Sequence, residues 1–230
     1  MLNPKKILLL LIFIQFWISC SNDKSSKIEK NEKTVIEIYL PKKRIQTKKG
    51  IKVTDSLLDK KYSPDLKKLI EKDWKKNVRY DTIKKRFIYA GEFKATKKDL
   101  PEKPFINDNE IIDFDFNTNT LILSKTAVEK IKKMHSDIRF SKQFVLTSNK
   151  KPILCGYFYN IISSYYVDTY YIIYDRTIKI DKTKETFNFI LRKIPMMDSN
   201  YKELPNMKLK KDFYDAFKKR KTVHDILHNQ

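Results

Sequence analysis

Residues Glu110–Met134 read EIIDFDFNTNTLILSKTAVEKIKKM, and this stretch carries the clearest fold signal in the 230-residue chain. Its two apolar-rich runs, Ile111–Phe116 and Thr120–Leu123, have the composition of half-buried strands. The three polar residues Asn117–Asn119 separate these runs and favour a tight turn. The segment therefore predicts a β-hairpin.

A helix is expected directly after this hairpin. Ser124 is a residue type that commonly caps a helix N-terminus. Ala127, Val128 and Ile131 then recur at helical spacing over Lys125–Met134, so they should form the inward face of the helix.

Outward from this segment, similar patterns predict further strands. Short runs rich in apolar, aromatic and β-branched residues occur at Thr34–Leu40, Arg86–Thr96, Phe144–Thr147, Ile153–Tyr159, Tyr170–Ile180 and Thr186–Ile194. Polar turns at Ser148–Lys151 and Asp181–Lys184 should join the last four runs into two hairpins.

Two more helices are expected. Ser63-Pro64-Asp65 places a capping serine before a proline, which is typical of a helix start, and this helix should end near Asn77. Leu209–Leu227 has the spacing of an amphipathic helix. Its inward residues should be Phe213, Phe217, Val223 and Leu227.

Hairpins dominate this pattern and βαβ alternation is weak. We therefore predict an α+β fold, an antiparallel sheet of hairpins covered by about three helices. Residues 34–230 should form a single domain. Within it, residues 34–98 would be the N-terminal part, and residues 99–230 the central unit with the C-terminal helix.

The N-terminal segment has the layout of a signal peptide. Lys5 and Lys6 precede the apolar run Ile7–Ser19. As a helix this run would rise roughly 20 Å, well short of the roughly 30 Å hydrocarbon core of a bilayer. Residues 1–19 are therefore predicted to be a signal helix that is removed, not a permanent membrane span.

The residues around Cys20 resemble the lipobox of bacterial lipoproteins. The small Ser19 precedes Cys20, and a polar stretch, Ser21–Lys27, follows it; Trp17 departs from the pattern, in which leucine is usual. The resemblance implies a diacylglyceryl group on the Cys20 sulfur, cleavage before this residue and acylation of the new amino terminus. A plain secretory signal with an incidental cysteine is the alternative.

The lipoprotein resemblance also implies an address in the cell. Residues 20–33 would form a flexible tether, and the mature protein would be lipid-anchored in the cell envelope. Ser21 directly after the cysteine resembles lipoproteins sent to the outer membrane, which implies a position facing the periplasm.

A second resemblance covers about half of the chain, from Asp99 to about Arg220. The runs DLPEKPFINDNEIIDFDFNTNTLILSKTAVEKI and FVLTSNKKPILCGYF, followed by a Ser-Ser step and a strand, resemble a domain of uncharacterised exported bacterial proteins. The resemblance implies no activity. It places Asp113, Gly156 and Ser163-Ser164 in the central unit.

The charge predicts affinity for polyanions. The chain has 49 basic and 28 acidic residues, a net charge of +21, and removal of Lys5 and Lys6 with the signal leaves +19. The candidate anion-binding residues, all on the last predicted helix or just before it, are Lys210, Lys211, Lys218 and Lys219. An envelope address argues against nucleic acid, so anionic lipids or acidic glycans are the expected partners besides the membrane itself. An AT-rich genome would produce the same lysine bias without any ligand.

Candidate catalytic and metal-binding residues are few. The chain has three glycines, too few for a phosphate-cradling loop or a G-x-S-x-G nucleophile elbow, and no cofactor is expected. His224 and His228 lie four apart and hence on one helix face, which makes them the best metal candidates. Two ligands do not complete a zinc site. Favourable interaction with the helix dipole is the simpler explanation.

Cys155 and the carboxylates have structural explanations beside functional ones. If Cys20 is lipidated, Cys155 has no disulfide partner, and a buried, inert thiol is the expected state. Asp113 and Asp115 share one strand face, where they would either bind a cation or pair with lysines.

The leading interpretation is a non-catalytic envelope lipoprotein that acts as a binding or structural module. The alternative is an enzyme, or a toxin-neutralising immunity or inhibitor protein, whose site is dispersed in the sequence. A cleft that holds Asp113, His135 or Asp168 with perturbed titration would favour the alternative.

We predict that the mature chain begins at Cys20 and carries acyl groups there, because several acyl chains are needed for stable anchoring. Mass spectrometry of the N-terminal peptide, from protein expressed with its signal in a bacterium, measures this. A Cys20→Ser variant should yield no acylated peptide. An N-terminus elsewhere, or an unmodified Cys20, would contradict the lipoprotein prediction.

Overall fold

The computed structural model describes residues 34–228 apart from 61, 64, 66–71, 135–139, 161, 164, 166, 175–179, 182 and 194–203. Lys33–Gln230 form one compact unit. The predicted signal segment, the tether and Cys20 lie outside the described residues. No helix in the described part of the chain has the length and apolar character needed to cross a membrane.

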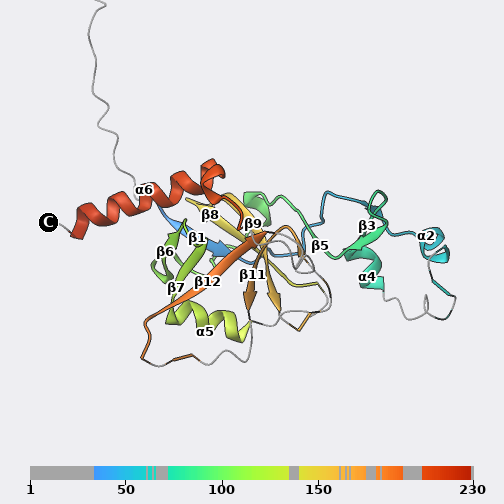
Figure 1. Cartoon of the computed structure of the whole chain (residues 1–230), viewed down its shortest axis with the longest axis horizontal. Coiled ribbons are helices and arrows are strands. Elements are labelled where there is room, and N and C mark those ends of the chain that lie inside the picture. Colours follow the sequence, from blue (N-terminus) through green and yellow to red (C-terminus); the bar gives the residue numbers. More distant parts are fainter. Residues whose placement is uncertain are drawn as a thin grey trace, which may run out of the picture. The chain divides into compact units, whose positions relative to one another are not determined.

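A seven-stranded, nearly closed, barrel-like sheet dominates the fold (Figure 1). Its strands are β1 (Ile36–Tyr39), β6 (Ile111–Asp115), β7 (Thr120–Ser124), β8 (Lys142–Ser148), β9 (Lys151–Asn160), β11 (Tyr170–Tyr174) and β12 (Thr186–Lys193). Their order across the sheet is β1-β8-β9-β11-β12-β7-β6. The fold is thus α+β, as predicted.

The prediction of a wholly antiparallel sheet was wrong, because β9 and β11 run parallel. Tyr157 in β9 lies opposite Tyr171 in β11. Between these strands the chain passes through β10 (Val167–Asp168), which pairs in parallel with β5 (Ala90–Gly91). Alternation of apolar and polar residues reports which face of a strand is buried, not the direction of its neighbour, so the sequence carried no sign of this pairing.

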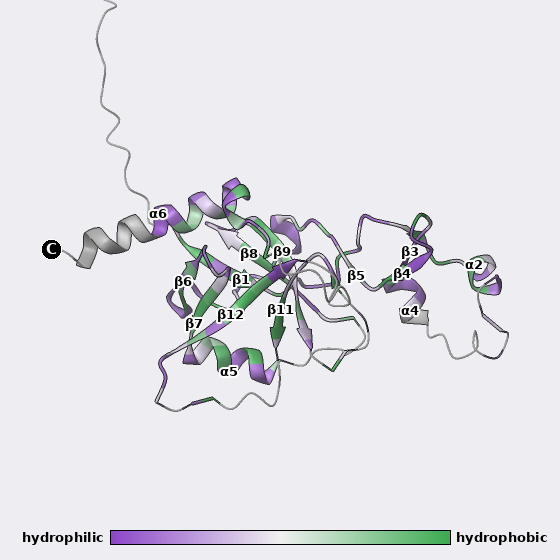
Figure 2. Cartoon of the chain, viewed as in Figure 1, coloured by the Kyte–Doolittle hydropathy of each residue, from purple (hydrophilic) through white to green (hydrophobic). Residues whose placement is uncertain are grey.

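The hairpin and helix predicted from Glu110–Met134 are confirmed. β6 and β7 pair antiparallel. The Ser124 hydroxyl accepts a hydrogen bond from the Ala127 backbone N–H at 3.3 Å and caps α5 (Lys125–Lys133). The inward face of α5 is buried as expected at Ala127, Val128 and Ile131, and Figure 2 shows hydrophobic and hydrophilic residues alternating along this helix.

The later hairpins are also present. β8 and β9 pair antiparallel, as do β11 and β12. The predicted run Tyr170–Ile180 extends past the described end of β11, and residues 175–179 lie outside the described part.

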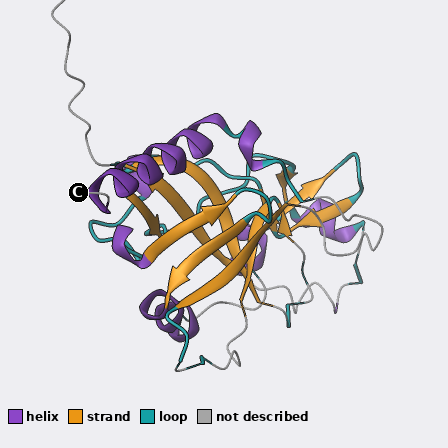
Figure 3. Ribbon diagram, turned by 60° about the vertical axis from the view of Figure 1, so that its left-hand side comes forward, coloured by secondary structure: helices purple, strands orange, loops and turns teal. Residues whose placement is uncertain are grey.

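Helix α6 (Lys211–His228) lies above the sheet and α5 below it in the views of Figures 1 and 3, and the buried residues of both helices belong to one core cluster. Phe213 and Phe217 are buried, with ring centroids 4.8 and 5.4 Å from that of Phe114 in β6. This confirms the first half of the predicted inward face. The side chains of Val223 and Leu227 lie outside the described part of the structure, so the second half of this face stays a prediction. Among the described residues α5 and α6 are the helices of seven residues or more, against about three covering helices predicted.

The N-terminal part departs most from the prediction. It forms a small sheet of β2 (Ile51–Lys52), β3 (Arg79–Asp81) and β4 (Arg86–Ile88), with the short helices α2 (Asp55–Asp59) and α4 (Lys72–Asn77). Helix α4 ends at Asn77 as predicted, and most of the predicted first turns of that helix lie outside the described residues. Three short 3-10 helices complete the secondary structure: η1 (Lys97–Asp99), η2 (Asp108–Glu110) and η3 (Met207–Leu209).

The single strand predicted over Arg86–Thr96 was wrong. The segment divides into β4, which pairs with β3, and β5, which pairs with β10. Two separate apolar clusters explain the division. Phe87 packs against Trp74 in one cluster, and Phe93 packs against Tyr157 in the other.

The barrel-like sheet is closed between its two edge strands, β1 and β6. The Ile38 backbone N–H donates to the Ile106 carbonyl at 3.0 Å, and the Ile38 carbonyl accepts from the backbone N–H groups of Phe105 and Ile106 at 2.8 and 3.0 Å. A carboxylate oxygen of Asp108 accepts from the Ile36 backbone N–H at 2.9 Å. The segment just before β6 thus pairs with the open edge of β1.

Arg220 of α6 completes this closure between β1 and the segment before β6, which we call the seam. Its Nε donates to the same Asp108 oxygen at 3.1 Å, and its Nη1 donates to the Ile112 carbonyl at 3.0 Å. Its Nη2 donates to the carbonyls of Asp108, at 2.8 Å, and of Ile111. The Arg220 and Asp108 side chains are only 18% and 16% exposed. One guanidinium therefore joins α6 to the closing edge of the sheet.

We predict that Arg220→Ala lowers the free energy of unfolding by about 3 kcal/mol, because it removes the guanidinium that pairs with a mostly buried carboxylate. The matched control is Lys219→Ala, a substitution of the exposed neighbour, which should change stability by less than about 0.5 kcal/mol. Urea unfolding followed by circular dichroism measures both. Equal, small changes for the two variants would contradict a structural role for the seam.

Candidate functional site

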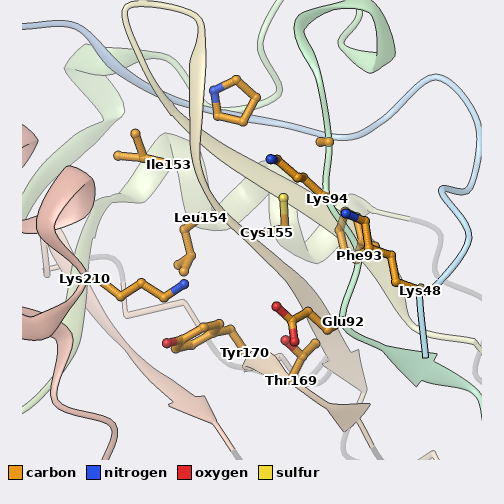
Figure 4. Close-up of a pocket in the computed structure, with 12 residues that line it drawn as sticks. Lys48, Glu92, Phe93, Lys94, Ile153, Leu154, Cys155, Thr169, Tyr170 and Lys210 are labelled. Atoms are coloured by element: carbon orange, nitrogen blue, oxygen red, sulfur yellow. The ribbon is translucent and has the colours of Figure 1, made fainter.

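A hollow of about 280 Å³ opens beside the first half of β9 (Figure 4). The sheet creates this hollow, because β9 is ten residues long and its pairing with β11 begins only at Tyr157. Pro152–Cys155 lie before that point. Within the described part of the chain, no strand pairs with them on the β11 side.

Gly156 lets β11 begin directly against β9. A Cβ added at this position would lie 2.7 Å from Cζ of Phe144 and 2.8 Å from the Tyr170 carbonyl oxygen. Both distances are closer than ordinary van der Waals contact allows. The absence of a side chain at Gly156 thus brings Tyr170, at the start of β11, to the edge of the hollow.

Three lysines from distant segments reach the hollow. Lys48 lies in the loop between β1 and β2, Lys94 follows β5, and Lys210 directly precedes α6. Glu92 adds one carboxylate and Thr169 one hydroxyl. Figure 4 shows the Lys210 ammonium pointing inward above the Tyr170 ring.

Tyr170 contributes an aromatic ring that two cations approach. The Nζ atoms of Lys210 and Lys193 lie 5.1 and 5.3 Å from its ring centroid, within the range of cation–π attraction. Burial, and secondarily the charge of Glu92, raise the pKa of the Tyr170 phenol. The phenol therefore stays protonated at neutral pH.

Cys155 lines the hollow between Leu154 and Gly156, with a half-buried thiol. Burial is the largest influence and raises the pKa of the Cys155 thiol, while a hydrogen bond from the Ala95 backbone and the charge of Lys210 act in the opposite direction. The net effect disfavours the thiolate, which is the reactive form of cysteine.

The four lysines named from the sequence, Lys210, Lys211, Lys218 and Lys219, are all exposed. Only Lys210 lines the hollow. Lys218 lies over the Tyr214 ring, with Nζ 5.8 Å from the centroid. Lys210 thus shares the hollow with Lys48, a residue far away in the sequence.

The other candidates do not assemble into one site. His135 lies outside the described residues, as do the side chains of His224 and His228, so the predicted metal pair stays a prediction. Among the described residues, no group of three or more histidine, cysteine or acidic side chains is placed to hold a metal ion. Asp168 pairs with Arg86 at 3.2 Å and links β10 to β4.

The remaining polar candidates have local partners. Asp115 accepts from the Thr118 hydroxyl at 2.6 Å and the Asn117 backbone N–H at 2.8 Å, and these hydrogen bonds lower the pKa of its carboxyl. It therefore closes the β6–β7 turn. The Ser163 carbonyl accepts from the Tyr159 hydroxyl at 2.7 Å.

A second hollow, of about 340 Å³, lies beside Arg44 and Phe140. The Arg44 guanidinium lies 5.3 Å from the Phe140 ring centroid and donates to the carbonyls of Ser141, at 3.2 Å, and Tyr89, at 2.7 Å. These bonds link the loop after β1 to the segments beside β8 and β4. Arg44 thus has a structural explanation.

No protein-family model, curated protein or solved structure matches this chain.

We predict that a small thiol reagent modifies Cys155 at pH 8 more slowly in the folded fragment Thr34–Gln230 than in the same fragment unfolded in urea. The raised pKa lowers the fraction of thiolate at that pH, and raising the pH toward 10 should narrow the difference. The absorbance of the thiol that the reagent releases on reaction measures the rate of Cys155 modification. A folded rate equal to or above the unfolded rate would contradict an unreactive Cys155.

Proposed function

We propose that this protein is a non-catalytic binding module of the bacterial envelope, held at a membrane by acyl chains on Cys20. It associates through lysines with anionic surfaces such as lipid head groups or acidic glycans. The observation that carries the proposal is the set of exposed lysines on and before α6, which adjoins a lysine-rimmed hollow.

The described part of α6 presents opposite faces of opposite character. Phe213 and Phe217 hold one face in the core. Lys211 and Lys218 are seven positions apart, two helical turns, and so lie together on the other face. Both are exposed, as is Lys219. Packing of the phenylalanines thus orients the lysines toward solvent.

Few acidic residues offset this charge. Five lysines and two aspartates occur in residues 208–219. One of the aspartates, Asp212, pairs with Lys151 at 3.2 Å, but the two side chains are 62% and 71% exposed, and such pairs are weak. The segment therefore presents a net positive surface.

Proximity to a membrane would make this surface effective. Each lysine close to an anionic bilayer contributes about 1 kcal/mol, within a Debye length of the surface. The mature chain's charge of +19 adds a general attraction to the local one. The acyl anchor on Cys20 would hold the domain within this range.

We predict that Lys218→Glu with Lys219→Glu weakens binding of the fragment Thr34–Gln230 to anionic phospholipid vesicles by about tenfold or more. The matched control is Lys132→Glu with Lys133→Glu on α5, which removes two exposed lysines and changes the net charge equally. Because α5 lies apart from α6 (Figure 3), its variant should bind more nearly like the parent. Co-sedimentation measures the binding.

Salt provides the second arm of this test. Binding should fall steeply between about 0.01 and 0.1 M salt, as the Debye length shrinks from about 30 to about 10 Å. Salt-insensitive binding, absence of binding at low salt, or equal loss in the α5 and α6 variants would contradict a dedicated lysine face.

A further inference from the structure

We propose that the hollow beside β9 binds a carboxylate-bearing sugar residue, as found in acidic glycans. The proposal rests on the proposed function and names the ligand class of one part of the surface. Four properties of the hollow carry it: its size, its mixed charge, its apolar wall and its recessed position.

The size suits one sugar ring. The hollow measures about 280 Å³, just below the range of about 300–1,000 Å³ that is typical of sites for drug-sized molecules. Because β9 extends past the start of β11, the hollow is a recess at the edge of the sheet. A terminal or side-branch sugar fits such a recess better than a continuous chain does.

The charge is mixed, and this separates a sugar acid from a simple anion. Lys48, Lys94 and Lys210 supply donors for a carboxylate. The Glu92 carboxylate supplies only acceptors when ionised, so it binds hydroxyl donors and repels a second negative charge. A phosphate dianion offers nothing to Glu92. A uronic acid offers one carboxylate to the lysines and several hydroxyls to Glu92 and Thr169.

Glu92 is available for such hydroxyls. Glu92 forms an ion pair with Lys49, 3.9 Å away, but the Glu92 and Lys49 side chains are 65% and 59% exposed, so the pair is weak. Its backbone is held firmly, because the Glu92 carbonyl accepts from the Lys48 backbone N–H at 3.1 Å and from the Thr47 hydroxyl at 2.9 Å. The carboxylate is thus free to turn while its Cα stays in place.

The apolar wall suits the C–H face of a pyranose ring. Leu154 and Tyr170 supply this wall, and the Lys210 ammonium lies 5.1 Å from the Tyr170 ring centroid. A sugar ring packed on Tyr170 would therefore place its carboxylate close to Lys210. Apolar walls with a few directed polar groups are the usual composition of small-molecule sites.

The recessed position distinguishes this hollow from the lysine face of α6. Lys211, Lys218 and Lys219 are exposed and do not line it. A flat bilayer meets such protruding lysines first, whereas a sugar enters the recess. Substitutions can therefore test the hollow and the exposed lysines of α6 separately.

The test uses the full acylated chain in neutral detergent micelles and D-glucuronate as the probe. Glucuronate should slow modification of Cys155 by a small thiol reagent, because Cys155 lines the hollow. Lys210→Gln should weaken this protection about tenfold, the value of one charge-assisted hydrogen bond. Lys94→Gln should weaken it in the same direction, and Lys219→Gln, outside the hollow, should change it less than about twofold.

Comparison with other ligands shows which class of ligand the hollow binds. D-glucose and inorganic phosphate should each protect Cys155 much less than glucuronate. Protection by phosphate equal to that by glucuronate would overturn the proposal in favour of a plain anion site. Protection by anionic vesicles but not by glucuronate would overturn it in favour of lipid.

Failure of this proposal is distinguishable from failure of the proposed function. Absence of glucuronate protection, with vesicle binding still reduced in the α6 double variant, would overturn only the sugar site. Absence of both effects would overturn both proposals.

Discussion

The pairing of Arg220 with Asp108 is the interaction on which the rest of the arrangement depends. The Asp108 carboxylate binds the backbone of β1, and the Arg220 guanidinium binds the carbonyls of β6, so together they join the two edges of a nearly closed sheet. Both side chains are mostly buried, so solvent screens the pair little. The same guanidinium sets the path of α6, whose phenylalanines then pack against Phe114.

The hollow follows from this closure together with one strand-length mismatch. Because α6 is held along the sheet, Lys210 at its start lies beside the first half of β9, where β11 has not yet begun. Gly156 allows β11 to begin so close. Lys48 arrives from the other side, on the loop that leaves β1. Lysines that are 162 positions apart in the sequence thus line the same recess.

The elements that local physics decides could be predicted from the sequence. The β6–β7 hairpin, the Ser124 cap of α5 and the inward Phe213 all follow from turn chemistry, capping and periodicity within short windows. The pairings that distant segments decide could not be predicted. The parallel pairing of β9 with β11 and the division of Arg86–Thr96 both depend on partners far along the chain. Lys210 was named as a candidate because of the lysine excess. Glu92, Thr169 and Tyr170 could not be predicted to share a site with it, because only the fold brings these residues together.

Dipolar electron paramagnetic resonance tests most directly whether the Arg220 seam holds the hollow together. Spin labels would replace Lys48 and Lys210 in the fragment Thr34–Gln230, with Cys155→Ser to remove the native thiol. The seam predicts a single, narrow, short distance between the labels, which broadens when Arg220→Gln is added. A narrow distance that Arg220→Gln leaves unchanged, or a long and broad distance in the parent, would contradict it.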